Sequence, residues 1–259
     1  MSVYDRFADV YASGPYMAYS QSMLEHFPRL QERYGLPTGG NLLDLACGTG
    51  AFAVGMASLG WQVTGYDQSA EMLKHARQRA AEAGSAIAWL QGDLRAMDFE
   101  EQFDLATCWF DSLNYILSEE ELQHVFRSVW WALKPGGWFV FDMNTVYGLA
   151  IGWTRQKWYV QTETPDLLEV HENSYDYEKN IGQMRIICFQ RQGGLWDRFE
   201  EVHCERAFQV TAIQSALECS GLRVEAVLGK ISDLTPYQPE NTRVFFVCQK
   251  PPAGAWNAK

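Results

Sequence analysis

The stretch Asn41-Leu-Leu-Asp-Leu-Ala-Cys-Gly-Thr-Gly50 decides the fold. Its first half is apolar apart from Asp44, which is typical of a buried strand. Gly48 and Gly50 then follow with a spacing of two, and the residues after Gly50 have the composition of a helix. A strand, a glycine turn and a helix N-terminus in this order let the backbone approach a ligand closely. The stretch therefore predicts a ligand site at the carboxyl end of a buried strand.

Strand and helix patterns alternate on both sides of this stretch. A helix over 118–133 begins with a capping box, because Ser118 is followed by Glu121. The alternation predicts an α/β fold, a doubly wound, seven-stranded, Rossmann-like sheet with right-handed parallel crossovers. The expected strands are 41–46, 61–67, 86–90, 103–109, 138–142, 222–228 and 243–249.

The pattern changes between residues 150 and 206, where no helix of useful length is expected. Aromatic and β-branched residues fill this region, and Gly193-Gly194 indicates a tight hairpin. We interpret it as an antiparallel β insertion after the fifth strand. Its expected strands are 158–163, 167–177, 183–191 and 195–208.

These patterns divide the chain into three parts. Residues 1–36 are expected to form two short aromatic helices, the second ending before Pro28, that act as a lid over a cofactor pocket. The alternative is that their aromatic residues simply pack on the main domain. Residues 37–149 and 207–250 form the α/β domain. Residues 150–206 form an antiparallel subdomain over the acceptor site. In the resumed α/β part, Thr211 and Gln214 suggest a second capping box.

Composition excludes several classes of function. The 259 residues carry a net charge of −11, with 32 acidic against 21 basic residues and no basic block, so a nucleic-acid partner is not expected. The six cysteines contain no Cys-x-x-Cys pair and form no ligand pattern with the five histidines, so no metal site is expected. No apolar run is long enough to cross a bilayer. We therefore expect a reduced, cytoplasmic protein without a membrane partner.

The glycine turn is compatible with two classes of cofactor. Residues 48–53 satisfy the Gly-x-Gly-x-x-Gly/Ala dinucleotide pattern, and Asp67 follows about 20 residues later, as a ribose-binding acid would. Asp44, however, lies just before the turn, where it would repel a pyrophosphate. S-adenosylmethionine has no phosphate, and its sulfonium and amino group are cationic, so an acid there is favourable.

Two further features favour S-adenosylmethionine. Asp93 and Leu94 follow the third strand, where an acid can accept from the adenine amino group while an apolar side chain covers the ring. Leu133-Lys-Pro-Gly-Gly137 precedes the fifth strand.

Five short motifs follow one another along the chain: residues 43–50, Tyr66-Asp67, Gly92-Asp93, Phe103-Asp104 and residues 133–137. In these motifs the sequence resembles the class I S-adenosylmethionine-dependent methyltransferases, and the resemblance covers about residues 40–145 and 209–249. One departure is Ala46, where many members have glycine. The resemblance implies S-adenosyl-L-methionine as the cofactor. It implies a cofactor site made of Tyr4, Tyr16, Asp44, Ala46, Cys47, Gly48, Gly50, Asp67, Gln68, Asp93, Leu94 and Phe110.

The tyrosine-rich N-terminus, residues 111–115 and the β-rich insertion resemble the small-molecule branch, in particular glycine and deoxyamino-sugar N-methyltransferases. This implies that Tyr4 and Tyr16 lie near the sulfonium. The candidate acceptor residues are Asn114 and Tyr115, after the fourth strand, and His203 in the insertion. For His203 a packing or surface role is the alternative.

The expected function is methyl transfer from S-adenosylmethionine to the nitrogen or oxygen of a small-molecule acceptor by in-line displacement. Such a reaction needs alignment and exclusion of water more than a catalytic triad. Two alternatives remain open from the sequence. One is a nicotinamide-dependent oxidoreductase that uses residues 48–53, and the other is a non-catalytic S-adenosylmethionine-binding protein.

Overall fold

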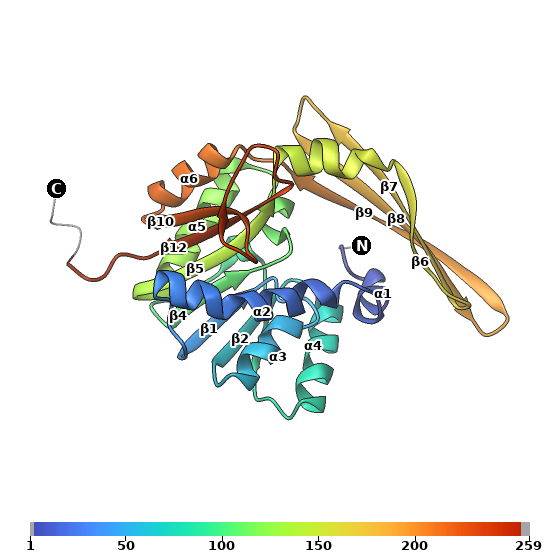
Figure 1. The fold of residues 1–259 in the computed structure, drawn as a ribbon. Coiled ribbons are helices and arrows are strands. Elements are labelled where there is room, and N and C mark those ends of the chain that lie inside the picture. The colour runs from blue at the N-terminus through green and yellow to red at the C-terminus, as the bar shows by residue number, and fades with distance from the viewer. Residues whose placement is uncertain (1–2, 255–259) are drawn as a thin grey trace.

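The computed structural model describes residues 3–254, which form two β-sheets (Figure 1). The larger sheet has the order β11-β10-β12-β5-β4-β1-β2-β3, and the smaller has the order β6-β7-β8-β9. The strands of the larger sheet are β1 (Asn41–Leu45), β2 (Gln62–Asp67), β3 (Ala88–Gln91), β4 (Phe103–Cys108), β5 (Leu133–Asn144), β10 (Arg223–Lys230), β11 (Thr235–Pro236) and β12 (Arg243–Gln249).

The central strands of the larger sheet run in one direction. β1 pairs in parallel with both β2 and β4, and β4 pairs in parallel with β5, while β12 runs antiparallel between β5 and β10. The chain moves outward from β1 to β3 and then crosses to β4 on the other side of β1. The carboxyl ends of β1 and β4 therefore flank a topological switch point, where α/β sheets bind ligands. The predicted Rossmann-like fold with an antiparallel insertion is confirmed.

Helices cover both faces of this sheet. Phe27 of α2 and Phe52 of α3 belong to a buried cluster on one face, and Phe126 of α5 and Leu217 of α6 belong to the cluster on the other. The helices are α1 (Phe7–Ser13), α2 (Met17–Tyr34), α3 (Ala51–Ser58), α4 (Ala70–Glu82), α5 (Glu119–Ala132) and α6 (Val210–Cys219). Shorter turns of helix are η1 (Leu94–Ala96), η2 (Ser112–Tyr115), η3 (Gly148–Gly152) and η4 (Trp153–Arg155).

Three local predictions were wrong or incomplete. α2 contains Pro28 instead of ending before it. A proline inside a helix costs about 3 kcal/mol, whereas burying two side chains such as Phe27 and Leu30 contributes about 1.5–3 kcal/mol each. α6 begins after Gln209, so Thr211 is already helical and does not cap it. The two-residue strand β11 adds an eighth strand to the sheet.

The smaller sheet is antiparallel and projects from the larger one (Figure 1, yellow to orange). Gly193, with φ +63°, lies in the tight turn between β8 and β9, as predicted. Every second residue of β9 from Phe199 to Glu205 is buried. Phe199 packs against Phe7 and Val10 of α1. Its strands are β6 (Trp158–Glu163), β7 (Leu167–Asp176), β8 (Ile181–Gln192) and β9 (Leu195–Arg206).

Candidate active site

The first cavity lies at the carboxyl ends of β1, β2 and β4 and has a volume of about 330 Å³. The glycine turn after β1 forms part of its wall. The backbone is left-handed at Gly48, with φ +52°, and a Cβ placed there would have no other atom within 4 Å. The turn thus leaves open space beside its backbone, as a closely approaching ligand requires.

Asp44 is a buried carboxyl in the wall of the first cavity. Thr107 donates a hydrogen bond of 2.9 Å to its Oδ1. Burial raises the pKa of Asp44 to about 7, although the Thr107 hydroxyl acts in the opposite direction. A cationic group bound beside this carboxyl would favour its ionised form. The buried Asp44 carboxylate therefore fits a ligand that carries an ammonium or sulfonium group.

Asp67, at the end of β2, holds two backbone segments together. Its carboxylate accepts from the amide of Gly48 at 2.8 Å and from the amide of Ser69 at 2.8 Å. Ser69 in turn caps α4 through the amide of Met72. Asp67 also lines the first cavity. The same carboxylate that fixes the glycine turn can therefore contact a ligand in that cavity.

A second cavity of about 410 Å³ lies next to the first. Its walls come from the N-terminal segment, the loop and η2 turn after β4, the start of β12, and the buried face of the smaller sheet. The two cavities share a layer of aromatic side chains, which we call the aromatic wall. This wall consists of Tyr4, Tyr11, Phe110 and Tyr115.

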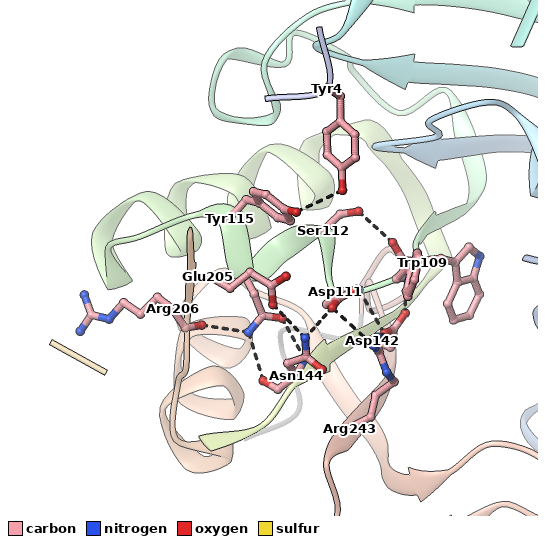
Figure 2. A network of polar contacts seen from close by, with 12 residues as sticks. Tyr4, Trp109, Asp111, Ser112, Tyr115, Asp142, Asn144, Glu205, Arg206 and Arg243 are labelled. Carbon is pink, nitrogen blue, oxygen red and sulfur yellow. Dashed lines mark hydrogen bonds and ion pairs between the residues drawn. The ribbon is translucent and has the colours of Figure 1, made fainter. Parts of the chain in front are cut away.

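A hydrogen-bonded chain runs from the aromatic wall into the smaller sheet. The hydroxyls of Tyr4 and Tyr115 lie 3.1 Å apart (Figure 2), and the Tyr115 hydroxyl lies 2.8 Å from Nδ1 of His203. Nε2 of His203 lies 3.6 Å from the Glu201 carboxylate. Burial raises the pKa of Tyr115 and of Tyr4 well above the usual value. Both phenols therefore stay protonated unless a partner accepts the proton.

The backbone after β4 is strained where it meets the second cavity. Phe110 and Asp111 both have left-handed backbones, with φ +59° and +54°. The Asp142 carboxylate accepts from both of their amides, at 2.7 and 3.2 Å. Arg243 pairs with Asp111 and Asp142, and Asn144 bridges Asp111 to Glu205 (Figure 2). This network fixes an unfavourable backbone conformation beside the site, a common feature of functional sites.

Comparisons with known proteins agree with this geometry. Residues 42–137 match the family model described as "Methyltransferase domain". The chain is 32% identical over 253 residues to the Bacillus subtilis (strain 168) protein named "Putative methyltransferase YqeM", covering 96% of this chain and 97% of that protein. The chain belongs to the class I S-adenosylmethionine-dependent methyltransferases. It is an enzyme of that family, and its cofactor is S-adenosyl-L-methionine.

Solved structures are similar over nearly the same length of the chain. An S-adenosylmethionine-dependent methyltransferase from Clostridium acetobutylicum ATCC 824 is similar with a TM-score of 0.83 and 26% identity, over 96% of this chain and 100% of that one. DesVI of Streptomyces venezuelae shares the fold, with a TM-score of 0.73 and 24% identity over 98% and 100% of the two chains. No helix within residues 3–254 is long and apolar enough to span a membrane.

In this methyltransferase the first cavity collects almost all residues expected at the cofactor. Those that line it are Tyr4, Asp44, Ala46, Cys47, Gly48, Asp67, Gln68, Asp93, Leu94 and Phe110. Gly50 does not line it. A Cβ on Gly50 would come within 2.6 Å of the Trp89 ring, so this glycine is required by packing behind the turn.

Asp93 lines the first cavity of the methyltransferase but is already paired. The guanidinium of Arg95, which sequence reasoning did not single out, donates to its carboxylate at 2.9 Å. This contact holds the pKa of Asp93 below its usual value. No motif marked Arg95, because its role depends on the η1 turn, which follows Asp93 and lets the Arg95 guanidinium reach back to the Asp93 carboxylate.

Tyr16 lies elsewhere than expected. It lines the second cavity, where its hydroxyl donates to Glu169 of β7, and not the first. Its ring stacks on Tyr11 and its hydroxyl is held by Glu169 of the smaller sheet, so the side chain is directed to the second cavity. Of the N-terminal tyrosines, Tyr4 and Tyr11 line both cavities.

The structure separates the three acceptor candidates. Tyr115 lines both cavities and His203 lines the second. Asn114 is fully buried, and its amide is occupied: it donates to the carbonyls of Asn144 and Arg206 at 3.0 and 2.9 Å and accepts from the Asn144 amide at 2.9 Å. Asn114 thus ties β5 to β9 and has no polar atom left for an acceptor.

Several residues that line or support the second cavity were missed, and Glu201 is one that supports it without lining it. Glu201 accepts from the amides of Tyr4, Arg6 and Phe7 and so attaches the N-terminal segment to β9. Glu205 and Arg243 line this cavity. They come from elements far apart in the chain, so no local spacing in the sequence could indicate them.

Proposed function

We propose that this methyltransferase transfers a methyl group to the nitrogen or oxygen of a small molecule in the second cavity, at the junction with the first cavity that the aromatic wall borders. The observation that carries the proposal is the shared wall: Tyr4, Tyr11, Phe110 and Tyr115 line both cavities. When bound, S-adenosylmethionine supplies an electrophilic methyl group on a cationic sulfur, which the acceptor displaces in line.

On the cofactor side, the chain contributes binding and orientation. Asp44 supplies a buried carboxylate for the cationic end of the cofactor, and Asp67 fixes the glycine turn. We assign the ribose to Asp67 and the adenine to Asp93 and Leu94. Cys47 takes no chemical part, because burial raises the pKa of its thiol well above the usual value.

On the acceptor side, Tyr115 and His203 provide a route for a proton. The Glu201 carboxylate faces Nε2 of His203, which favours a proton on that nitrogen and leaves Nδ1 to accept from the Tyr115 hydroxyl. A proton that leaves the acceptor passes to the Tyr115 oxygen while the Tyr115 proton moves to His203. The aromatic wall and the N-terminal segment exclude water from the transfer.

Similarity to another methyltransferase supports an amine-bearing acceptor. The chain is 29% identical over 195 residues, covering 74% of this chain and 79% of the other, to a Streptomyces venezuelae enzyme. That enzyme is named dTDP-3-amino-3,4,6-trideoxy-alpha-D-glucopyranose N,N-dimethyltransferase.

The test has two stages. Calorimetry should show binding of S-adenosylmethionine and S-adenosylhomocysteine in the micromolar range. Release of S-adenosylhomocysteine should then be measured with a panel of small amines and alcohols. Turnover of at least one member supports the proposal. Cofactor binding without turnover of any amine or alcohol would contradict it and favour a non-catalytic role.

A further inference from the structure

The smaller sheet contains the tripeptide Glu-Val-His twice, at residues 169–171 in β7 and 201–203 in β9. In both copies the glutamate and the histidine are buried on one face of the sheet. In both copies Nδ1 of the histidine contacts a tyrosine hydroxyl. His203 contacts Tyr115 at 2.8 Å, and His171 contacts Tyr159 at 2.9 Å.

The hydrogen bonds around Glu169 determine the direction of the second chain. Its carboxylate contacts the Tyr16 hydroxyl, the Thr162 hydroxyl at 3.0 Å and Nε2 of His171 at 2.7 Å. An ionised carboxylate only accepts hydrogen bonds, so all three partners donate to it and Nε2 of His171 carries a proton. In the neutral ring Nδ1 then has only a lone pair, so the Tyr159 hydroxyl must donate to His171.

In this direction the Tyr159 hydroxyl donates its proton to His171, and the side chain of Asn173 donates to its oxygen. One of the two lone pairs of the Tyr159 oxygen then remains for a ligand. Tyr159 lines the second cavity beside Trp153 and Gln161, and it does not line the first. Tyr115 lines both cavities, so it marks the end of the second cavity next to the cofactor. The second cavity therefore offers two tyrosine oxygens as hydrogen-bond acceptors, one at the transfer end and one away from it.

We propose that Tyr159, positioned by His171 and Glu169, binds a hydroxyl or amino group of the methyl acceptor that is remote from the atom methylated. The inference rests on the proposed function and narrows its substrate class: the acceptor carries a second hydrogen-bond donor. Tyr159 is the binding residue, and His171 and Glu169 are positioning residues.

One test needs no ligand. In protein labelled with ¹⁵N-histidine, two-bond ¹H–¹⁵N spectra distinguish the two neutral tautomers, and His171→Gln assigns the signal. We expect the neutral Nε2–H form for His171 at pH 7.5. A ring protonated on Nδ1 would overturn the inference, because His171 would then donate to the Tyr159 oxygen and, together with Asn173, would occupy both of its lone pairs.

The second test uses two matched amines, cyclohexylamine and trans-4-aminocyclohexanol, which differ by one remote hydroxyl. Their binding is measured by tryptophan fluorescence on protein saturated with S-adenosylhomocysteine. The aminoalcohol should bind about three- to tenfold more tightly, as one net hydrogen bond allows. Tyr159→Phe should abolish this preference, whereas Tyr177→Phe, at a tyrosine that is 69% exposed, should keep it.

Absence of the preference in the wild-type protein, or its persistence in Tyr159→Phe, would overturn the inference. This readout is binding without turnover. Failure of the proposed function is read separately, as the absence of S-adenosylhomocysteine release from S-adenosylmethionine with any amine or alcohol.

Discussion

The two cavities share a wall but are built in different ways. The first is made mainly of short segments that follow neighbouring parallel strands, such as residues 46–49 after β1, 67–68 after β2 and 92–95 after β3. The second brings together the N-terminal segment, the η2 turn, the smaller sheet and the start of β12. The first can therefore keep its shape across a family, whereas the second depends on contacts between distant segments. Cofactor binding and acceptor chemistry should thus respond to different substitutions.

The largest expected effect is on turnover, at the second cavity. In the proposed route His203 accepts the Tyr115 proton, so His203→Gln should lower kcat by about 100-fold or more, the range for loss of a general base. Affinity for S-adenosylhomocysteine, measured by calorimetry, should stay within about twofold. His124→Gln, at an exposed position on α5, is the matched control. A parallel loss of cofactor affinity would show that the cavities are not separable.

The next effect belongs to the first cavity. Asp44→Asn keeps the hydrogen bond from Thr107 but removes the charge, so affinity for S-adenosylmethionine should fall about 10- to 100-fold, as for a lost charged hydrogen bond. Calorimetry and a melting curve of the free protein measure affinity and folding together. Unchanged affinity in a folded variant would remove Asp44 from the cofactor site.

The pH dependence of binding follows from the same carboxyl. Burial raises the pKa of Asp44 from 3.8 to about 7, so the free protein holds a proton there below pH 7. A cationic ligand needs the ionised form, so affinity should fall as the pH is lowered below 7, by up to about tenfold per unit. Asp44→Asn should give a flatter profile between pH 5.5 and 7.5. A flat wild-type profile would contradict the assignment.

The smallest expected effect is at Asp93. Its side chain is 37% exposed and already paired with Arg95, so one further contact to adenine is screened by solvent. Asp93→Ala should weaken S-adenosylhomocysteine binding by no more than about fivefold, the range of an exposed ion pair. Calorimetry on Asp93→Ala and Asp67→Ala compares the two residues. The loss of affinity should be larger for Asp67→Ala, because Asp67 is buried. A larger loss for Asp93→Ala would contradict this ranking.

Local sequence patterns predicted the first cavity well and the second poorly. Ser118 caps α5 as expected, and Ser69 caps α4 in the same way, because capping depends on residues within one turn. The hairpin at Gly193 follows from the same local logic. Asn114 was assigned to the acceptor because it follows β4, but its amide is used by β5 and β9, which join the site only after folding.

The sequence by itself determined the order of strands and helices, the glycine turn with its acids, and hence the cofactor. These features depend on backbone geometry and burial over short spans, which residue type and spacing control directly. Only the tertiary structure decided which side chains line the second cavity. Tyr16 and Tyr4 are equally aromatic in the sequence, yet packing of α1 against β9 sends the first to Glu169 and the second to Tyr115. That choice depends on long-range contacts, which no local pattern encodes.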